Sequence, residues 1–115
     1  MKRHKPDLLR LSTRELLASR RRLAARLSDV EHVLLGSLVE QMRRCGRASC
    51  RCATGDLHGP YAYFAQRRGG RGMRYVPEAL VSTVRSCVLS GEEVEAVLAE
   101  ISAINVELMA RRAIS

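Results

Sequence analysis

The chain has 115 residues, with 20 lysines and arginines, 12 carboxylates and a formal net charge of +8. This length predicts a single domain over residues 1–115. No stretch approaches the roughly 18 consecutive apolar residues of a membrane-spanning helix. The basic start is not followed by the apolar segment of a signal peptide, so we expect a cytoplasmic protein whose thiols stay reduced.

The positive charge lies in the first two thirds of the chain. Of the 20 basic residues, 17 precede Val76, and residues 43–75 carry eight arginines against one carboxylate, Asp56. Polarised basic surfaces attract polyanions and speed their encounter with the protein. The sequence therefore predicts a nucleic-acid partner, although a basic surface can also serve solubility alone.

The first part of the chain predicts one long helix. Residues 1–11 are expected to form a flexible basic arm. Ser12 and Glu15 form an S-x-x-E capping box, which satisfies free amide groups at a helix start. Apolar side chains then recur at helical spacing as far as Leu38, without an intervening proline. We expect a helix over residues 12–43 that packs on a partner helix of similar length.

The middle of the chain predicts a loop and a β-hairpin. Glycine and proline punctuate residues 44–60, which is typical of a loop. Two short aromatic segments flank Gly69-Gly70, and glycine supplies the positive φ that tight hairpin turns require. We therefore expect a β-hairpin over residues 61–76. A two-residue turn would place Phe64 opposite Tyr75 and Arg68 opposite Arg71.

The last part of the chain, residues 77–112, predicts further helix. Pro77 suits the first turn of a helix. A second S-x-x-E box, at Ser90 and Glu93, predicts a new helix or a kinked continuation that starts near Gly91.

Together these elements predict a mainly α fold with a small β-hairpin. We expect a long antiparallel helical hairpin or coiled coil, into which the loop and the two-stranded ribbon are inserted. Two helices make a thin core, so their apolar faces are also expected to form a homodimer.

Three cysteines and a histidine in the loop match the preferred ligand set of structural zinc. Their spacing is C-x4-C-x-C-x5-H, and the neighbouring Arg47 and Arg51 are expected to lower the thiol pKa values. The alternative is a loop of ordinary reduced thiols. A fourth cysteine, Cys87, is expected to be a core thiol. The predicted zinc ligands are Cys45, Cys50, Cys52 and His58.

The hairpin carries an arginine cluster, and arginine makes bidentate contacts to phosphate and to guanine edges. A slim two-stranded ribbon fits the major groove of DNA. Tyr61 and Tyr63 could stack on bases, but strand residues beside a core more often pack within the protein. The predicted nucleic-acid contacts are Arg67, Arg68, Arg71 and Arg74, with Arg47 and Arg51 from the loop.

No catalytic set is recognisable, because the sequence has no phosphate-binding glycine loop and no paired acidic cluster. We expect a non-enzymatic, DNA-binding accessory or regulatory protein in which zinc braces the arginine-rich hairpin. One alternative is a coiled-coil interaction module that binds an acidic protein. A second alternative is a thiol redox sensor.

The loop and hairpin motifs together resemble a family of small bacterial and archaeal proteins known mainly as a domain of unknown function. That family is often encountered near mobile genetic elements. The resemblance covers residues 45–77 and implies a shared metal-and-hairpin module, without an established activity. The matching residues are Cys45-Gly46, Cys50-Arg51-Cys52, Gly55, His58-Gly59-Pro60-Tyr61 and Arg74-Tyr75-Val76-Pro77.

Overall fold

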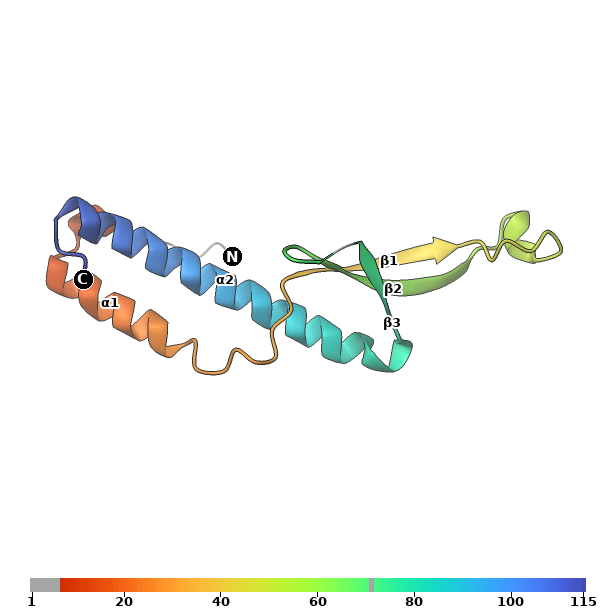
Figure 1. The fold of residues 1–115 in the computed structure, drawn as a ribbon, viewed down its shortest axis with the longest axis horizontal. Helices are drawn as coiled ribbons and strands as arrows, with labels where there is room; N and C mark the ends of the chain where they lie inside the picture. Colours follow the sequence, from red (N-terminus) through yellow and green to blue (C-terminus); the bar gives the residue numbers. More distant parts are fainter. Residues whose placement is uncertain (1–6, 71) are drawn as a thin grey trace. The chain divides into compact units, whose positions relative to one another are not determined.

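A computed structural model describes residues 7–70 and 72–115 (Figure 1). The main elements are α1 (Thr13–Ala25), β1 (Gly36–Arg43), β2 (His58–Gln66), β3 (Met73–Val76) and α2 (Val81–Ala110). Three short 3-10 helices are η1 (Leu8–Arg10), η2 (Arg51–Ala53) and η3 (Glu78–Leu80). The chain divides into two compact units: unit 1 holds the described part of Met1–Glu31 with Glu93–Ser115, and unit 2 is His32–Glu92. Helix α2 therefore contributes to both units.

Unit 1 is a short antiparallel pair of helices. Arg26, at the end of α1, binds the Glu93 carboxylate at 2.9 Å, and Arg111, after the end of α2, lies 3.4 Å from the Thr13 hydroxyl. Because each contact joins the end of one helix to the start of the other, α1 and the second half of α2 run in opposite directions. Their apolar faces enclose one core cluster, formed by Leu16, Leu23, Val97, Ile104 and Leu108.

The predicted start of α1 is confirmed and its predicted end is wrong. The Ser12 hydroxyl accepts a hydrogen bond from the Glu15 amide at 3.1 Å, as expected of a capping box. The helix ends at Ala25, whereas residues 36–43, predicted as its last turns, form strand β1. In the sequence, Leu34 and Leu38 continue the helical spacing of apolar residues. In the structure, they pack against the sheet core of unit 2. Strand pairing overrides this short apolar pattern.

The predicted flexible arm over residues 1–11 is only partly within the described residues. Residues 1–6 lie outside them. Leu8–Arg10 form η1, and the Asp7 carboxylate caps this turn by accepting the Leu9 amide at 3.1 Å. The second half of the expected arm is therefore folded.

Unit 2 is a three-stranded antiparallel sheet in the order β1-β2-β3, with the first part of α2 on one face. Alternate side chains of β2, Ala62 and Phe64, point to the helix side and are 7% and 8% exposed. They pack with Val76 of β3 and Val88 of α2. The other face of the sheet carries the odd-numbered residues of β2.

Helix α2 is continuous over Val81–Ala110, so the prediction that a new helix starts near Gly91 is wrong. A Cβ atom at Gly91 would collide with the Leu34 carbonyl oxygen. One turn earlier in α2, the Cys87 carbonyl accepts a hydrogen bond from the Leu34 amide at 3.0 Å. Gly91 thus allows close packing of the chain before β1, and the Ser90–Glu93 motif lies within the helix.

The β2–β3 hairpin exists, but its predicted register is wrong. Tyr63 pairs with Tyr75 and Phe64 pairs with Arg74, a shift of one residue from the expected pairs. The connection therefore runs from Arg67 to Gly72 in place of a two-residue turn. Because a one-residue shift moves side chains to the other face, Tyr75 lies away from the core. The predicted contact of Arg68 with Arg71 involves a residue outside the described ones.

These differences change the fold class. The long helical hairpin and the mainly helical class are not confirmed, because α1 has 13 residues and β1 adds a third strand to the predicted ribbon. The long C-terminal helix is present and has 30 residues. Within the described residues, no helix combines the length and the apolar character needed to cross a bilayer.

Candidate metal centre and basic surfaces

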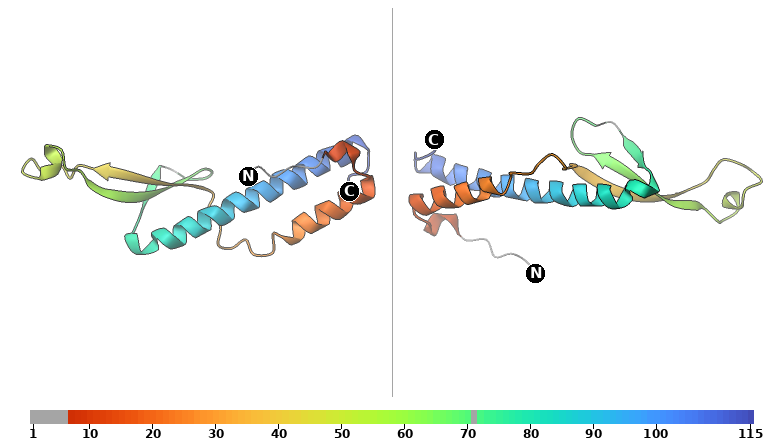
Figure 2. Two further views of the ribbon diagram at one scale, coloured as in Figure 1. Left: turned by 180° about the vertical axis from the view of Figure 1, so that it is seen from behind. Right: turned by 90° about the horizontal axis from the view of Figure 1, so that it is seen from below.

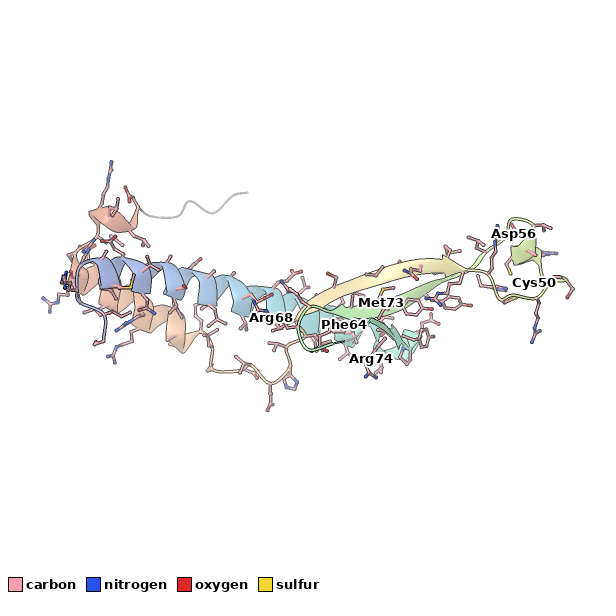
Figure 3. The ribbon with its side chains drawn as sticks, turned by 45° about the horizontal axis from the view of Figure 1, so that its top comes forward. Cys50, Asp56, Phe64, Arg68, Met73 and Arg74 are labelled. Carbon is pink, nitrogen blue, oxygen red and sulfur yellow. The ribbon has the colours of Figure 1, made fainter. Side chains whose placement is uncertain are left out.

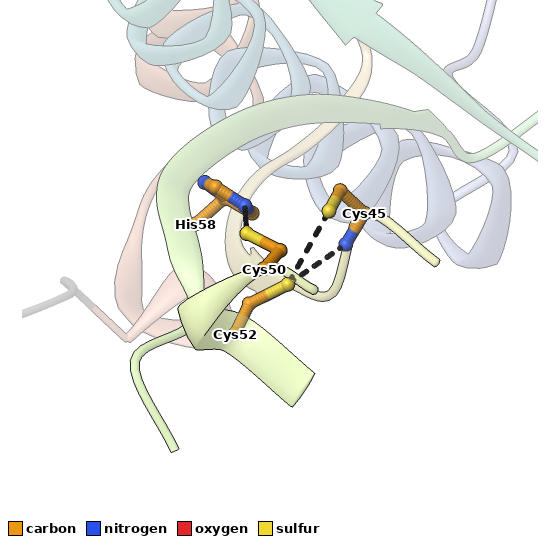
Figure 4. Close-up of side chains that lie close together, drawn as sticks. All are labelled: Cys45, Cys50, Cys52 and His58. Atoms are coloured by element: carbon orange, nitrogen blue, oxygen red, sulfur yellow. Dashed lines mark hydrogen bonds between the residues drawn. The ribbon is translucent and has the colours of Figure 1, made fainter. Parts of the chain in front are cut away.

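The four predicted ligands come together in the loop that connects β1 to β2 (Figure 4). The side-chain donor atoms of Cys45, Cys50, Cys52 and His58 all lie within 4.8 Å of one another. The Cys50 sulfur is 3.0 Å from His58 Nε2, and the sulfurs of Cys45 and Cys52 are 3.4 Å apart. All the cysteines of the chain are free thiols.

Local backbone structure turns the cysteines towards one another. The Cys50 amide donates a hydrogen bond to the Arg47 carbonyl at 3.1 Å and closes a turn. This turn leads into η2, which carries Cys52. The Cys45 amide donates to the Cys52 sulfur at 3.2 Å, and Cys52 is only 1% exposed. Gly46, with φ +83°, makes the first bend after Cys45.

Gly59 holds the histidine end of the loop. Its φ is +126°, and an added Cβ would lie 2.9 Å from the Gln41 carbonyl oxygen of β1. A side chain at this position would therefore push the two strands apart where the loop begins. Glycine at residue 59 keeps His58, the first residue of β2, next to Cys50.

The donor set fits a tetrahedral ion. A Zn–S bond of about 2.3 Å places two sulfur ligands about 3.8 Å apart at tetrahedral angles. The Cys45–Cys52 sulfur separation of 3.4 Å is slightly shorter than this edge. The 3.0 Å from the Cys50 sulfur to His58 Nε2 is shorter than the sulfur–nitrogen edge of about 3.6 Å that a Zn–N bond of about 2.0–2.1 Å gives. All the donor atoms lie within 4.8 Å of one another. Small side-chain rotations suffice for coordination, so the cluster could hold a metal ion.

Hydrogen bonds within the cluster shift its pKa values in different directions. The pKa of Cys50 is lowered to about 6, first by a hydrogen bond from the Cys52 backbone and then by the Cys52, Cys45 and His58 side chains. Hydrogen bonds with the Cys45 and Cys50 thiols raise the pKa of His58. Neither shift comes from Arg47 or Arg51, so the predicted effect of the two arginines is replaced by contacts within the cluster.

Cys52 differs from Cys50 because it is buried. The Cys45 amide lowers its pKa, but burial and the neighbouring Cys45 and Cys50 thiols outweigh that effect and raise it. The cluster therefore holds one thiol that ionises readily and one that resists ionisation. An incoming cation would have to displace the Cys52 proton.

The predicted nucleic-acid contacts fall into two groups at opposite ends of β2. Arg47 and Arg51 lie on the β1–β2 loop, whereas Arg67 and Arg68 begin the β2–β3 connection. The ribbon shows these two connections at opposite ends of the long strand (Figure 2), and Figure 3 labels Cys50 in the first and Arg68 in the second. The candidate metal centre therefore lies at the start of β2, and the described arginines Arg67 and Arg68 follow its end. A bound ion would directly order the β1–β2 loop and the arginines on it, and bracing of the hairpin through β2 stays a prediction.

Two further predicted arginines need separate comment. Arg74 pairs with Phe64, so it leaves β3 towards the helix side of the sheet. Arg71 lies outside the described residues. The hairpin arginines therefore do not form one surface within the part of the chain that the structure describes.

Charge around the metal centre is strongly positive. The guanidinium groups of Arg44, Arg47 and Arg51 are exposed and have no hydrogen-bond or ion-pair partner among residues 7–70 and 72–115. The neighbouring Arg43 lies over the Tyr63 ring, with its Cζ atom 4.4 Å from the ring centroid. In α1, by contrast, Arg20 binds Asn105 at 2.8 Å and Arg26 binds Glu93.

The sequence did not indicate that Tyr75 shares a surface with Tyr61 and Tyr63, because Phe64 was its expected partner. Tyr61 and Tyr63 lie outside the core cluster, but they are half-buried and pack on Tyr75, and Tyr63 also packs on Arg43. For these two tyrosines the signal was present as alternation, because Tyr61 and Tyr63 flank the buried Ala62. Cys87 is half-buried in α2 and is not one of the four clustered residues.

Comparison with known proteins identifies a family. The family model described as Domain of unknown function (DUF6788) matches residues 13–86, which include the metal centre and the whole sheet. No curated protein and no solved structure matches the chain.

Proposed function

The chain belongs to the DUF6788 family, a domain of unknown function, and we propose from its own residues that it is a non-enzymatic, DNA-binding accessory protein with a structural zinc site. One observation carries the proposal. Three thiols and an imidazole converge in a loop whose exposed arginines have no partner among the described residues.

Zinc is the ion that this donor set favours. Thiolate and imidazole ligands in a closed tetrahedral set are typical of structural zinc, and the C-x4-C-x-C-x5-H spacing leaves no position for water or substrate. Bound zinc would supply folding free energy to the loop. The chain would supply all four ligands of the ion, and one of them, Cys52, is buried.

The arginines supply the affinity for DNA in this proposal. Arg43, Arg44, Arg47 and Arg51 share the loop and its base with one carboxylate, Asp56. Guanidinium groups bind phosphate oxygens in pairs, and each neutralised phosphate releases counterions from the DNA. A loop ordered by zinc would hold these groups in place before the DNA arrives, which lowers the entropic cost of binding.

The test is the salt dependence of duplex binding by zinc-loaded protein, measured by fluorescence anisotropy. Four phosphate contacts predict a slope of log K against log salt of about −3 to −4. Affinity should then fall about 100-fold between roughly 50 and 200 mM salt. Affinity that does not change with salt, or failure to bind either duplex or single-stranded DNA at the lower salt, would reject the proposal.

A pair of matched variants locates the contact. Arg47→Gln with Arg51→Gln should reduce the steepness of the slope by about 2. The control, Arg21→Gln with Arg22→Gln, removes the same charge from exposed positions of α1. Equal losses in the two variants would mean that net charge, and not the loop, binds DNA.

A homodimer, or a partner helix as in the interaction-module alternative, is supported by a separate observation on α2. Leu98, Val106 and Met109 are 49%, 57% and 59% exposed, and at helical spacing they form one stripe. We expect this stripe to pair with a second copy of the chain. Light scattering should give twice the chain mass, and Leu98→Ser with Val106→Ser should give the monomer mass. A wild-type monomer at high concentration would reject the homodimer.

A further inference from the structure

One face of the sheet in unit 2 carries an aromatic surface that the metal centre does not use. Tyr61 and Tyr63 leave β2 on the face opposite the buried Ala62 and Phe64, and Tyr75 of β3 pairs with Tyr63. The Tyr75 ring contacts both others edge to face, with centroids 5.8 Å from Tyr63 and 6.4 Å from Tyr61. Tyr75 is 56% exposed, which is unusual for a large ring in a folded strand.

A cation lies on the same surface. The Arg43 guanidinium covers the Tyr63 ring at 4.4 Å, so an aromatic ring and a delocalised cation are already stacked there. Val39 and Gln41 of β1 pair with Tyr63 and Tyr61 and complete this face. The surface therefore offers flat π systems and a guanidinium, which are the groups that stack on nucleobases.

Positive charge lies at both ends of this aromatic surface. Arg44, Arg47 and Arg51 occupy the β1–β2 loop, and Arg68 occupies the β2–β3 connection (Figure 3). Nine residues of β2 separate the two ends, which is about 30 Å. Phosphates can meet arginine at each end while bases lie on the tyrosines between them.

We propose that this aromatic surface, which we call the tyrosine face, binds unpaired DNA. Bases would stack on Tyr75 and Tyr61, and phosphates would bind the arginines of the β1–β2 loop and of the β2–β3 connection. This inference rests on the proposed function, because it takes nucleic acid as the ligand. It adds that the strand must be single, since the faces of bases in a duplex are covered by their neighbours. An exposed tyrosine can stack only on a base that is free of that stack.

The experiment compares three ligands of about 12 nucleotides, a length within the site sizes of single-strand binders. They are an oligodeoxythymidine, an abasic strand of the same length and charge, and a duplex. Stacking predicts that the zinc-loaded protein binds the oligodeoxythymidine at least about fivefold more tightly than the abasic strand. Equal affinity for these two strands would overturn the tyrosine-face inference while leaving phosphate binding intact.

Variants at Tyr75 provide the second arm. Tyr75→Leu should lower affinity for the oligodeoxythymidine by about fivefold or more and leave affinity for the abasic strand unchanged. Tyr75→Phe keeps the ring and should bind as the wild type does. A Phe variant as weak as the Leu variant would overturn base stacking at this position.

Three other outcomes separate failure of the proposed function from failure of the tyrosine-face inference. Failure to bind any of the three ligands would reject the proposed function itself. Binding at least tenfold tighter to an RNA strand of equal length than to the DNA strand would reject DNA as the ligand. Tighter binding to the duplex than to the single strand would overturn the tyrosine-face inference alone.

Discussion

The sulfur atoms of Cys45 and Cys52 lie 3.4 Å apart, although six residues separate them in the chain. At this distance the two thiols can share one metal ion. They can also form a disulfide after a small movement, since the S–S bond is about 2.05 Å long. The same pair therefore connects the metal centre to the redox chemistry that reduced cysteines make possible.

Metal content tests the ligand set directly. Protein purified without added metal is expected to contain about one zinc per chain, because four ligands from one loop form a closed site. Cys52→Ser removes a buried ligand and should abolish bound zinc, as measured by elemental analysis. Cys87→Ser is the matched control, since this cysteine lies outside the cluster, and it should keep full zinc content. Loss of zinc in both variants would contradict the assignment.

Oxidation should join Cys45 to Cys52 and release the ion. With hydrogen peroxide as oxidant, the two thiolates that would hold the ion lose two electrons and the S–S bond forms. The O–O bond breaks, and both oxygens leave as water with two protons taken up from solvent. Peptide mapping by mass spectrometry should find this pair first, and a chromogenic chelator should report zinc release over the same time. A first disulfide that involves Cys87 would contradict the distance argument.

In the metal-free protein, Cys50 should be the most reactive thiol at neutral pH. Its pKa is lowered from the usual 9.0 to about 6, because hydrogen bonds from the Cys52 backbone and the neighbouring side chains favour the thiolate. The stabilisation from this thiolate is present above pH 9 and is lost as the pH falls through about 6. Alkylation of Cys50 should therefore rise between roughly pH 5 and 7 and then level off.

The unfolded chain is the control for that pH profile. In denaturant, all four cysteines should react alike, with a rise centred near pH 8.5. A Cys50 profile that is the same in folded and unfolded protein would show that the hydrogen bonds within the cluster do not act in solution.

Gly91→Ala should destabilise the protein despite the better helix propensity of alanine. Alanine gains about 1 kcal/mol in a helix interior, but its Cβ would collide with the Leu34 carbonyl and force backbone movement. We expect a net loss of about 1–2 kcal/mol in the free energy of unfolding, measured in urea. Ser90→Ala, at the exposed neighbouring position, should be neutral or slightly stabilising. A stabilised Gly91→Ala protein would contradict the close contact.

Local signals predicted the parts of the molecule that depend on nearby residues. The four clustered residues that could hold a metal ion lie within 14 residues, so local glycine-rich turns can bring them together. The Ser12 cap acts across three residues. Both predictions were available because the interacting groups are close in the chain. The same locality made the family resemblance visible, and the family match confirms a domain of unknown function.

Long-range pairing decided the rest. Residues 36–43 have no strand character that outweighs their helical spacing, and they become β1 because β2 supplies backbone partners. Backbone pairing between β2 and β3 fixes the register of the hairpin. A shift of one residue places Tyr75 beside Tyr63, on the face away from Phe64.

The sequence by itself therefore determined the cluster of three cysteines and a histidine, the helix cap and the excess of arginine, all of which follow from spacing or count. The tertiary structure alone decided that residues 36–43 form a third strand and that Tyr75 lies with Tyr61 and Tyr63 on the face away from Phe64. The physical reason is that strand pairing joins backbone groups far apart in sequence. A shift of one residue changes the face of every side chain without any change in composition.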